Sequence, residues 1–227
     1  MVGVWLAIDI DHTLLRTEQF QYEAWKKTLG HTERFTEKLY CNTYCGRGSW
    51  EIAQEIVVIL SRDPKELYEE RMRKLDNILS KQKSFVLCAG AEMFFDYIHQ
   101  EKLPYVLVTG WSKQESNEKI AKSDLKNIIK KDNPIITKDD YTCSKPNPEP
   151  YLMAKEVLKK LHGGDYIKKY IGFEDTVAGM LSAVSAWYDN VHIIPHERTK
   201  ISFDSYQKMQ QLPKNVVKLN RIDDYRL

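Results

Sequence analysis

The sequence predicts an α/β protein with a doubly wound, mostly parallel sheet and a small helical domain inserted after the first strand. Strand-like and helix-like segments alternate along most of the chain, which is the pattern of such a sheet. The first strand-like segment is a continuous apolar run, as expected for a strand covered on both faces. Only helical patterns follow it, over residues 17–82. We therefore expect an α/β core of residues 1–16 and 87–227 and a helical domain of residues 17–86.

The first strand is expected over residues 4–8, Val-Trp-Leu-Ala-Ile, because this short run is apolar and rich in β-branched and bulky side chains. The helical domain would begin with an amphipathic helix from Glu18 to Leu29. A second helix is expected from Trp50 to Leu60. A third begins at Asp63-Pro64, since aspartate suits the N-cap and proline suits the first helical position.

From residue 87 onward strands and helices alternate. The expected elements are a helix over 91–100, a strand over 105–108, a helix from 113, a strand over 134–137, a helix over 151–161, a strand over 169–173, a helix over 176–186 and a last parallel strand over 190–194. A helix near 204–211 and an apolar stretch at 215–219 complete the chain. Because the helical domain follows the first strand, it would lie over the carboxyl edge of the sheet, where such folds bind ligands.

Composition excludes several classes of partner. The 34 basic and 32 acidic residues leave a formal net charge of +2, which gives no reason to expect a nucleic-acid or membrane-surface partner. The four cysteines form no Cys-x-x-Cys pair, so we expect reduced thiols. The apolar N-terminal stretch stops at Ile8, too short for a signal peptide or a membrane span, and a cytoplasmic location is expected.

Polar residues follow four of the predicted strands. In chain order they are Asp9 with Asp11, Thr109 with Gly110, Lys145, and Glu174 with Asp175. The carboxyl ends of parallel strands meet in one crevice, so we expect these residues to form a single site.

Such a set suits phosphoryl transfer. Up to four carboxylates at one edge require a cation, and their hard oxygen ligands select Mg²⁺. A hydroxyl and a backbone N–H at Thr109-Gly110 would bind phosphate oxygens, and Lys145 would supply positive charge. One carboxylate can attack phosphorus and form an aspartyl-phosphate, which water then hydrolyses. A second acid two residues away can protonate the leaving oxygen and later deprotonate the water.

Four segments resemble, in order, the motifs of the haloacid dehalogenase superfamily. They are Asp9-Ile10-Asp11-His12-Thr13-Leu14, where most members read Asp-x-Asp-Gly-Thr-Leu; Thr109 after an apolar strand; Lys145-Pro146-Asn147-Pro148-Glu149-Pro150-Tyr151; and Gly172-Phe173-Glu174-Asp175-Thr176-Val177-Ala178-Gly179. The resemblance covers nearly the whole chain. It implies a Rossmann-like core, and it makes residues 17–86 the small helical cap that closes over the substrate in this superfamily.

The resemblance also implies residue roles. Asp9 would be the nucleophile and a metal ligand, and Asp11 the acid/base, with its backbone carbonyl on the metal. Thr109 and Lys145 would hold the phosphoryl group. Asp175 would bind Mg²⁺, with Glu174 either beside it on the metal or behind it. The most similar subgroup is that of the β-phosphoglucomutase-like phosphatases, judging from Glu174-Asp175 and from Ala24-Trp25 in the first cap helix.

Three positions qualify this resemblance. His12 replaces the usual glycine and must either adopt or relax that backbone, or else touch the leaving group. Gln21 stands where the mutases carry a histidine, which favours hydrolysis over transfer to a sugar. Arg47, in a segment resembling the specificity loop of the cap, would reach a second anionic group on the substrate or remain a surface arginine.

The sequence thus predicts a magnesium-dependent phosphatase that hydrolyses a small phosphorylated metabolite. A sugar phosphomutase is the alternative enzyme, and a non-catalytic binding protein on this fold is a third reading. We expect a monomer or a weak homodimer.

Overall fold

The computed structural model describes residues 3–30, 35–163 and 167–227 of the chain. Its sheet has six strands in the order β3-β2-β1-β4-β5-β6, and every neighbouring pair is parallel. The strands are β1 (Gly3–Asp9), β2 (Tyr105–Val108), β3 (Ile135–Ile136), β4 (Ile167–Glu174), β5 (Asn190–Ile193) and β6 (Val216–Lys218). This order is that of the doubly wound Rossmann-like sheet, so the predicted fold class is confirmed.

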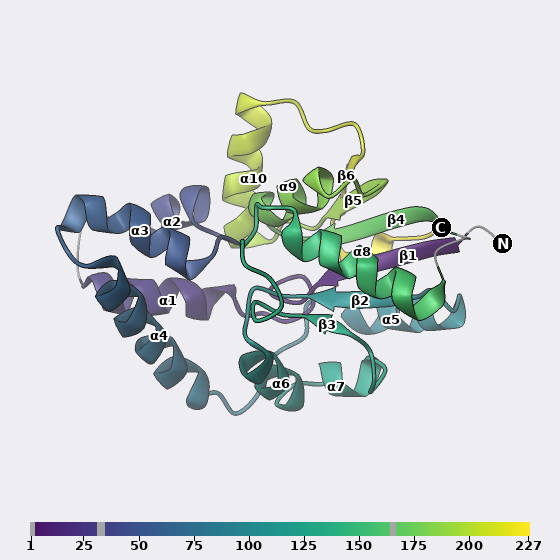
Figure 1. Cartoon of the computed structure of the whole chain (residues 1–227), viewed down its shortest axis with the longest axis horizontal. Helices are drawn as coiled ribbons and strands as arrows, with labels where there is room; N and C mark the ends of the chain where they lie inside the picture. The colour runs from purple at the N-terminus through teal and green to yellow at the C-terminus, as the bar shows by residue number, and fades with distance from the viewer. Residues whose placement is uncertain (1–2, 31–34, 164–166) are drawn as a thin grey trace.

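Alternate residues of β1 point to the two faces of the sheet, and each face is covered by helices (Figure 1). Leu6 and Ile8 pack in the cluster that contains α5 (Ala91–Gln100), α7 (Leu125–Ile128) and the 3₁₀ helix η2 (Ile222–Asp224). Ala7 packs in the cluster of α8 (Glu149–His162), α9 (Val177–Ser185) and α10 (Glu197–Met209). Burial on both faces explains why β1 is a continuous apolar run.

Four helices lie together beyond the carboxyl edge of the sheet, on the left of Figure 1. They are α1 (Glu18–Leu29), α2 (Glu37–Thr43), α3 (Ser49–Leu60) and α4 (Pro64–Ser80). They share an apolar cluster of their own, centred on Trp25, Tyr40 and Ile52. Asp63 caps α4 as predicted, because its side chain accepts hydrogen bonds from the N–H groups of Lys65 and Glu66. All four helices fall within the helical domain proposed for residues 17–86.

The C-terminal part of the sheet differs from the prediction. The strand over 190–194 was expected to be the last parallel strand, but Val216–Lys218 pairs with β5 in parallel and forms the sixth. This edge strand is only three residues long and largely exposed, so its sequence lacks the buried apolar run of the inner strands. The helix expected near 204–211 begins earlier, at Glu197, and ends at Met209. Helices α2 and α7 were not predicted.

Candidate active site

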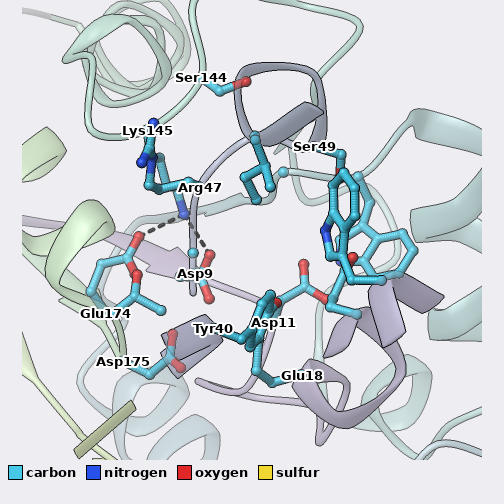
Figure 2. Close-up of a pocket in the computed structure, with 18 of the residues that line it drawn as sticks. Asp9, Asp11, Glu18, Tyr40, Arg47, Ser49, Ser144, Lys145, Glu174 and Asp175 are labelled. Atoms are coloured by element: carbon cyan, nitrogen blue, oxygen red, sulfur yellow. Dashed lines mark hydrogen bonds and ion pairs between the residues drawn. The ribbon is translucent and has the colours of Figure 1, made fainter. Parts of the chain in front are cut away.

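The polar residues that follow the strands meet at the carboxyl edge of the sheet. Asp9 ends β1, Glu174 ends β4 and is followed by Asp175, and Lys145 lies in the loop between β3 and α8. These side chains line a cavity of about 90 Å³ together with Asp11. The helices beyond the edge add Glu18, Tyr40 and Ser49 to the lining, and the turn between α2 and α3 adds Arg47 (Figure 2). The cavity therefore lies between the sheet and the helical segment.

Lys145 bridges two carboxylates in the floor of this cavity. Its Nζ donates to Asp9 Oδ1 and to Glu174 Oε1, both at 2.6 Å, and all three side chains are buried. The hydroxyl of Tyr151 also donates to Glu174 Oε1, at 2.6 Å. Burial alone would lower the pKa of Lys145, but Asp9 and Glu174 outweigh it and raise that pKa. Lys145 is therefore a fixed positive charge.

Three carboxylates around this lysine have the character of a divalent-cation site. Asp9, Glu174 and Asp175 each offer an oxygen within 4.8 Å of the others, and all three are buried. Asp9 Oδ2 is buried without a hydrogen-bond partner. Burial and the neighbouring carboxylates raise the pKa values of Asp9 and Asp175 well above their usual range, although Lys145 opposes this. Hard oxygen donors with an unpartnered oxygen fit Mg²⁺, and these three residues would hold it.

Asp175 is also bound from outside the cavity. His196 Nε2 lies 3.0 Å from Asp175 Oδ2, and the ring of His12 stacks on that of His196 with centroids 3.4 Å apart. His12 takes the left-handed backbone conformation, φ 62°, at the position of the usual glycine. Its Nδ1 accepts the N–H of Glu18 at 2.9 Å. His12 thus adopts the glycine-like backbone, and its side chain is not among those that line the cavity.

Asp11 is surrounded by donors. Its Oδ1 accepts from Thr17 at 2.7 Å and from Lys119 at 3.1 Å, and its Oδ2 accepts from Thr109 at 2.6 Å. The ammonium of Lys119, which belongs to α6 (Lys113–Ala121), is buried and contacts the ring of Trp111. Burial alone would raise the pKa of Asp11, but Lys119 and the two hydroxyls outweigh it and lower that pKa.

Two predicted binding residues are engaged within the protein. The Thr109 hydroxyl donates to Asp11, and its neighbour Gly110 lines the cavity. Arg47 lines the cavity too, but its guanidinium pairs with Glu55 on α3. The segment carrying Arg47 lies close to the core, because a Cβ at Gly46 would collide with the side chain of Thr176. This contact brings the helical segment onto the residues that follow β4.

The sequence did not reveal several side chains that complete the site. Thr17, Lys119, Tyr151 and His196 each bond to a predicted site residue. Tyr151 is the last residue of the third motif and Thr17 lies shortly after the first, so their position was a usable signal. Lys119 lies on a mostly polar helix that reads as a solvent-exposed one, and nothing in its neighbourhood marks it as buried.

The sequence of residues 6–193 matches the family model of the haloacid dehalogenase-like hydrolases. No curated protein matches the chain. Within the part of the chain that the structure describes, no helix is long and apolar enough to cross a membrane.

Several solved structures have a similar fold. A HAD hydrolase of family IA, variant 3, from Entamoeba histolytica superposes with a TM-score of 0.72 at 24% identity, over 100% of this chain and 96% of that one. A putative phosphoglycolate phosphatase from Lactobacillus plantarum has a TM-score of 0.69 at 17% identity, with 99% and 98% covered. A putative β-phosphoglucomutase from Thermotoga maritima has a TM-score of 0.64 at 18% identity, with 97% and 95% covered.

Proposed function

Since the chain belongs to the haloacid dehalogenase-like hydrolases, we propose that it is a magnesium-dependent phosphatase acting on a small phosphorylated metabolite through an aspartyl-phosphate on Asp9. The observation that carries this proposal is the buried cluster of Asp9, Glu174 and Asp175 around Lys145, with Asp11 beside it. The helical segment would be the cap over the substrate.

Asp9 is held for attack on phosphorus. Lys145 fixes its Oδ1, and its buried Oδ2 has no partner. As the bond from Asp9 to phosphorus forms, the bond from phosphorus to the leaving oxygen breaks. The proton for that oxygen would pass through Asp11 from the ammonium of Lys119, which donates to Asp11 Oδ1; in the second step Asp11 takes a proton from the water that displaces Asp9.

Positive charge must offset the phosphoryl oxygens while these bonds change. Lys145 supplies one charge from the floor of the cavity. Bound Mg²⁺, held by Asp9, Glu174 and Asp175, would act as a Lewis acid on a phosphoryl oxygen. Closure of residues such as Arg47 and Ser49 over the cavity would exclude bulk water from the site.

The direct test is phosphate release from an aryl phosphate, with Mg²⁺ and with EDTA, by the wild type and Asp9→Asn. Asparagine keeps the shape of the side chain but is not a nucleophile, so we expect the variant to lose at least about 10³-fold in kcat/KM, within the range of covalent catalysis. Equal rates for the two proteins would refute the nucleophile, and equal rates with EDTA would refute the metal.

A phosphomutase is the second candidate, because one structural neighbour is described as a putative β-phosphoglucomutase. Gln21 argues against it, since its side-chain oxygen accepts from Arg71 and an amide cannot act as a base on a sugar hydroxyl. Conversion of a hexose 1-phosphate to the 6-phosphate in the presence of a bisphosphate would decide for the mutase.

A further inference from the structure

The ring of His196 joins the start of α10 to the carboxylate of Asp175. Its Nδ1 accepts the N–H of Arg198 at 3.4 Å, and its Nε2 lies 3.0 Å from Asp175 Oδ2. The ring is about four-fifths buried. It does not line the catalytic cavity, and its bond to Asp175 links it to the site.

These two contacts suit the tautomer of His196 that carries its proton on Nε2. In that tautomer Nδ1 accepts the backbone N–H of Arg198, and Nε2–H donates to Asp175. Both nitrogens are then used as in a neutral imidazole. A neutral ring orients the carboxylate without placing a positive charge beside a cation.

His12 holds this ring from the other side. The two rings stack at an interplanar angle of 28°, and His12 is itself fixed by the N–H of Glu18. Its backbone is in the left-handed region, which residues other than glycine rarely adopt. The loop after β1 thus supports His196, which lies in the segment after β5.

We propose that His196 is a positioning residue that orients Asp175 for Mg²⁺, and that His12 keeps the ring of His196 in place. The inference rests on the proposed function, since it concerns the same cation site. While its Oδ2 is bonded to His196, Asp175 offers a carboxylate oxygen within 4.8 Å of those of Asp9 and Glu174. Hydrogen-bond partners of ligating carboxylates commonly set metal affinity in this way.

The test is Mg²⁺ binding to the full chain without substrate, measured by isothermal titration calorimetry. His196→Leu removes the donor, and we expect it to weaken binding by about 10–100-fold. His196→Gln carries an N–H at the position of Nε2 and should restore much of the affinity. His192→Leu is the matched control, because His192 also stacks on an aromatic ring but contacts no carboxylate of the site. It should bind Mg²⁺ like the wild type.

A second variant guards against a folding defect, since His196 also caps α10. His12→Gly removes the stacked ring while suiting the backbone, and it should weaken Mg²⁺ binding less than His196→Leu does. Wild-type affinity in both His196→Leu and His12→Gly, or an equal loss in His192→Leu, would overturn the inference and leave the phosphatase intact. A wild type that binds no Mg²⁺ would overturn both.

Discussion

Replacing Lys145 by methionine should destabilise the metal-free protein and do so most at alkaline pH. The lysine is the shared partner of two buried carboxylates, at 2.6 Å from each. Removing one member of a buried ion pair leaves an uncompensated charge and costs about 3–5 kcal/mol. Total stabilities of about 5–15 kcal/mol make this a large fraction of the folding free energy.

The pH dependence follows from the raised pKa values of Asp9 and Asp175. A carboxylate whose pKa is raised by folding stabilises the fold below its unfolded pKa, and this contribution is lost as pH rises through the folded pKa. Without Lys145 nothing opposes the rise at Asp9. The deficit of Lys145→Met should therefore be larger at pH 8 than at pH 5.5.

The assay is urea unfolding in EDTA at these two pH values, followed by circular dichroism. Lys122→Met is the control, because Lys122 pairs with Glu118 on the exposed surface of α6 and such a pair contributes at most about 1 kcal/mol. A Lys145→Met deficit no larger than that of the control, or one that is greatest at pH 5.5, would refute the reasoning.

Three further predictions concern the same region. With Mg²⁺ saturating, the free energy of unfolding should fall as pH drops from about 6.5 to about 4. Burial lowers the pKa values of His12 and His192 to about 4, so in this range the unfolded chain binds protons that the folded chain does not. Thermal unfolding of His192→Phe should show a shallower fall. Lys119→Met removes a donor to Asp11 and should lower kcat/KM about tenfold more for an alkyl phosphate than for an aryl phosphate, because an aryl leaving group needs less protonation. Equal losses for the two substrates would mean that Lys119 is only structural. Inorganic phosphate should give a calorimetric binding signal with Mg²⁺ and none in EDTA, since the carboxylates of the cavity repel it.

The fold was predictable where burial leaves a periodic signal. β1 lies inside the sheet and is apolar throughout, and α1 has the bounds that its pattern predicted, Glu18–Leu29. The edge strand Val216–Lys218 pairs with β5 on one side and is mostly exposed. Its three residues are too few to show an alternation of apolar and polar side chains. Helix α2 is seven residues long, within the length at which helices depend on tertiary packing more than on their own sequence.

The site was predictable to the extent that the sheet alone brings residues together. Asp9, Thr109 and Glu174 lie at the carboxyl ends of neighbouring strands, so strand order was enough to place them. Lys119 and Asp11 are 108 residues apart, and they meet only because α6 packs beside the loop after β1. Arg47 was predicted to reach the substrate or remain at the surface, and its pairing with Glu55 depends on the turn between α2 and α3. Contacts of this kind depend on tertiary packing that no motif spacing encodes.

The charges of the cavity argue for an order of binding. Lys145 offsets one of the three clustered carboxylates, Lys119 offsets Asp11, and His196 adds no charge to Asp175. The cluster of Asp9, Glu174 and Asp175 therefore keeps an excess of two negative charges when all three are ionised. A phosphate monoester brings nearly two more, and Coulomb repulsion at such distances is several kcal/mol, of order 4 for one pair of charges 4 Å apart at a protein surface. A divalent cation held by the cluster would cancel this excess before the ester binds. Asp9, whose pKa is raised by burial and by Glu174, would then be ionised and able to act as the proposed nucleophile.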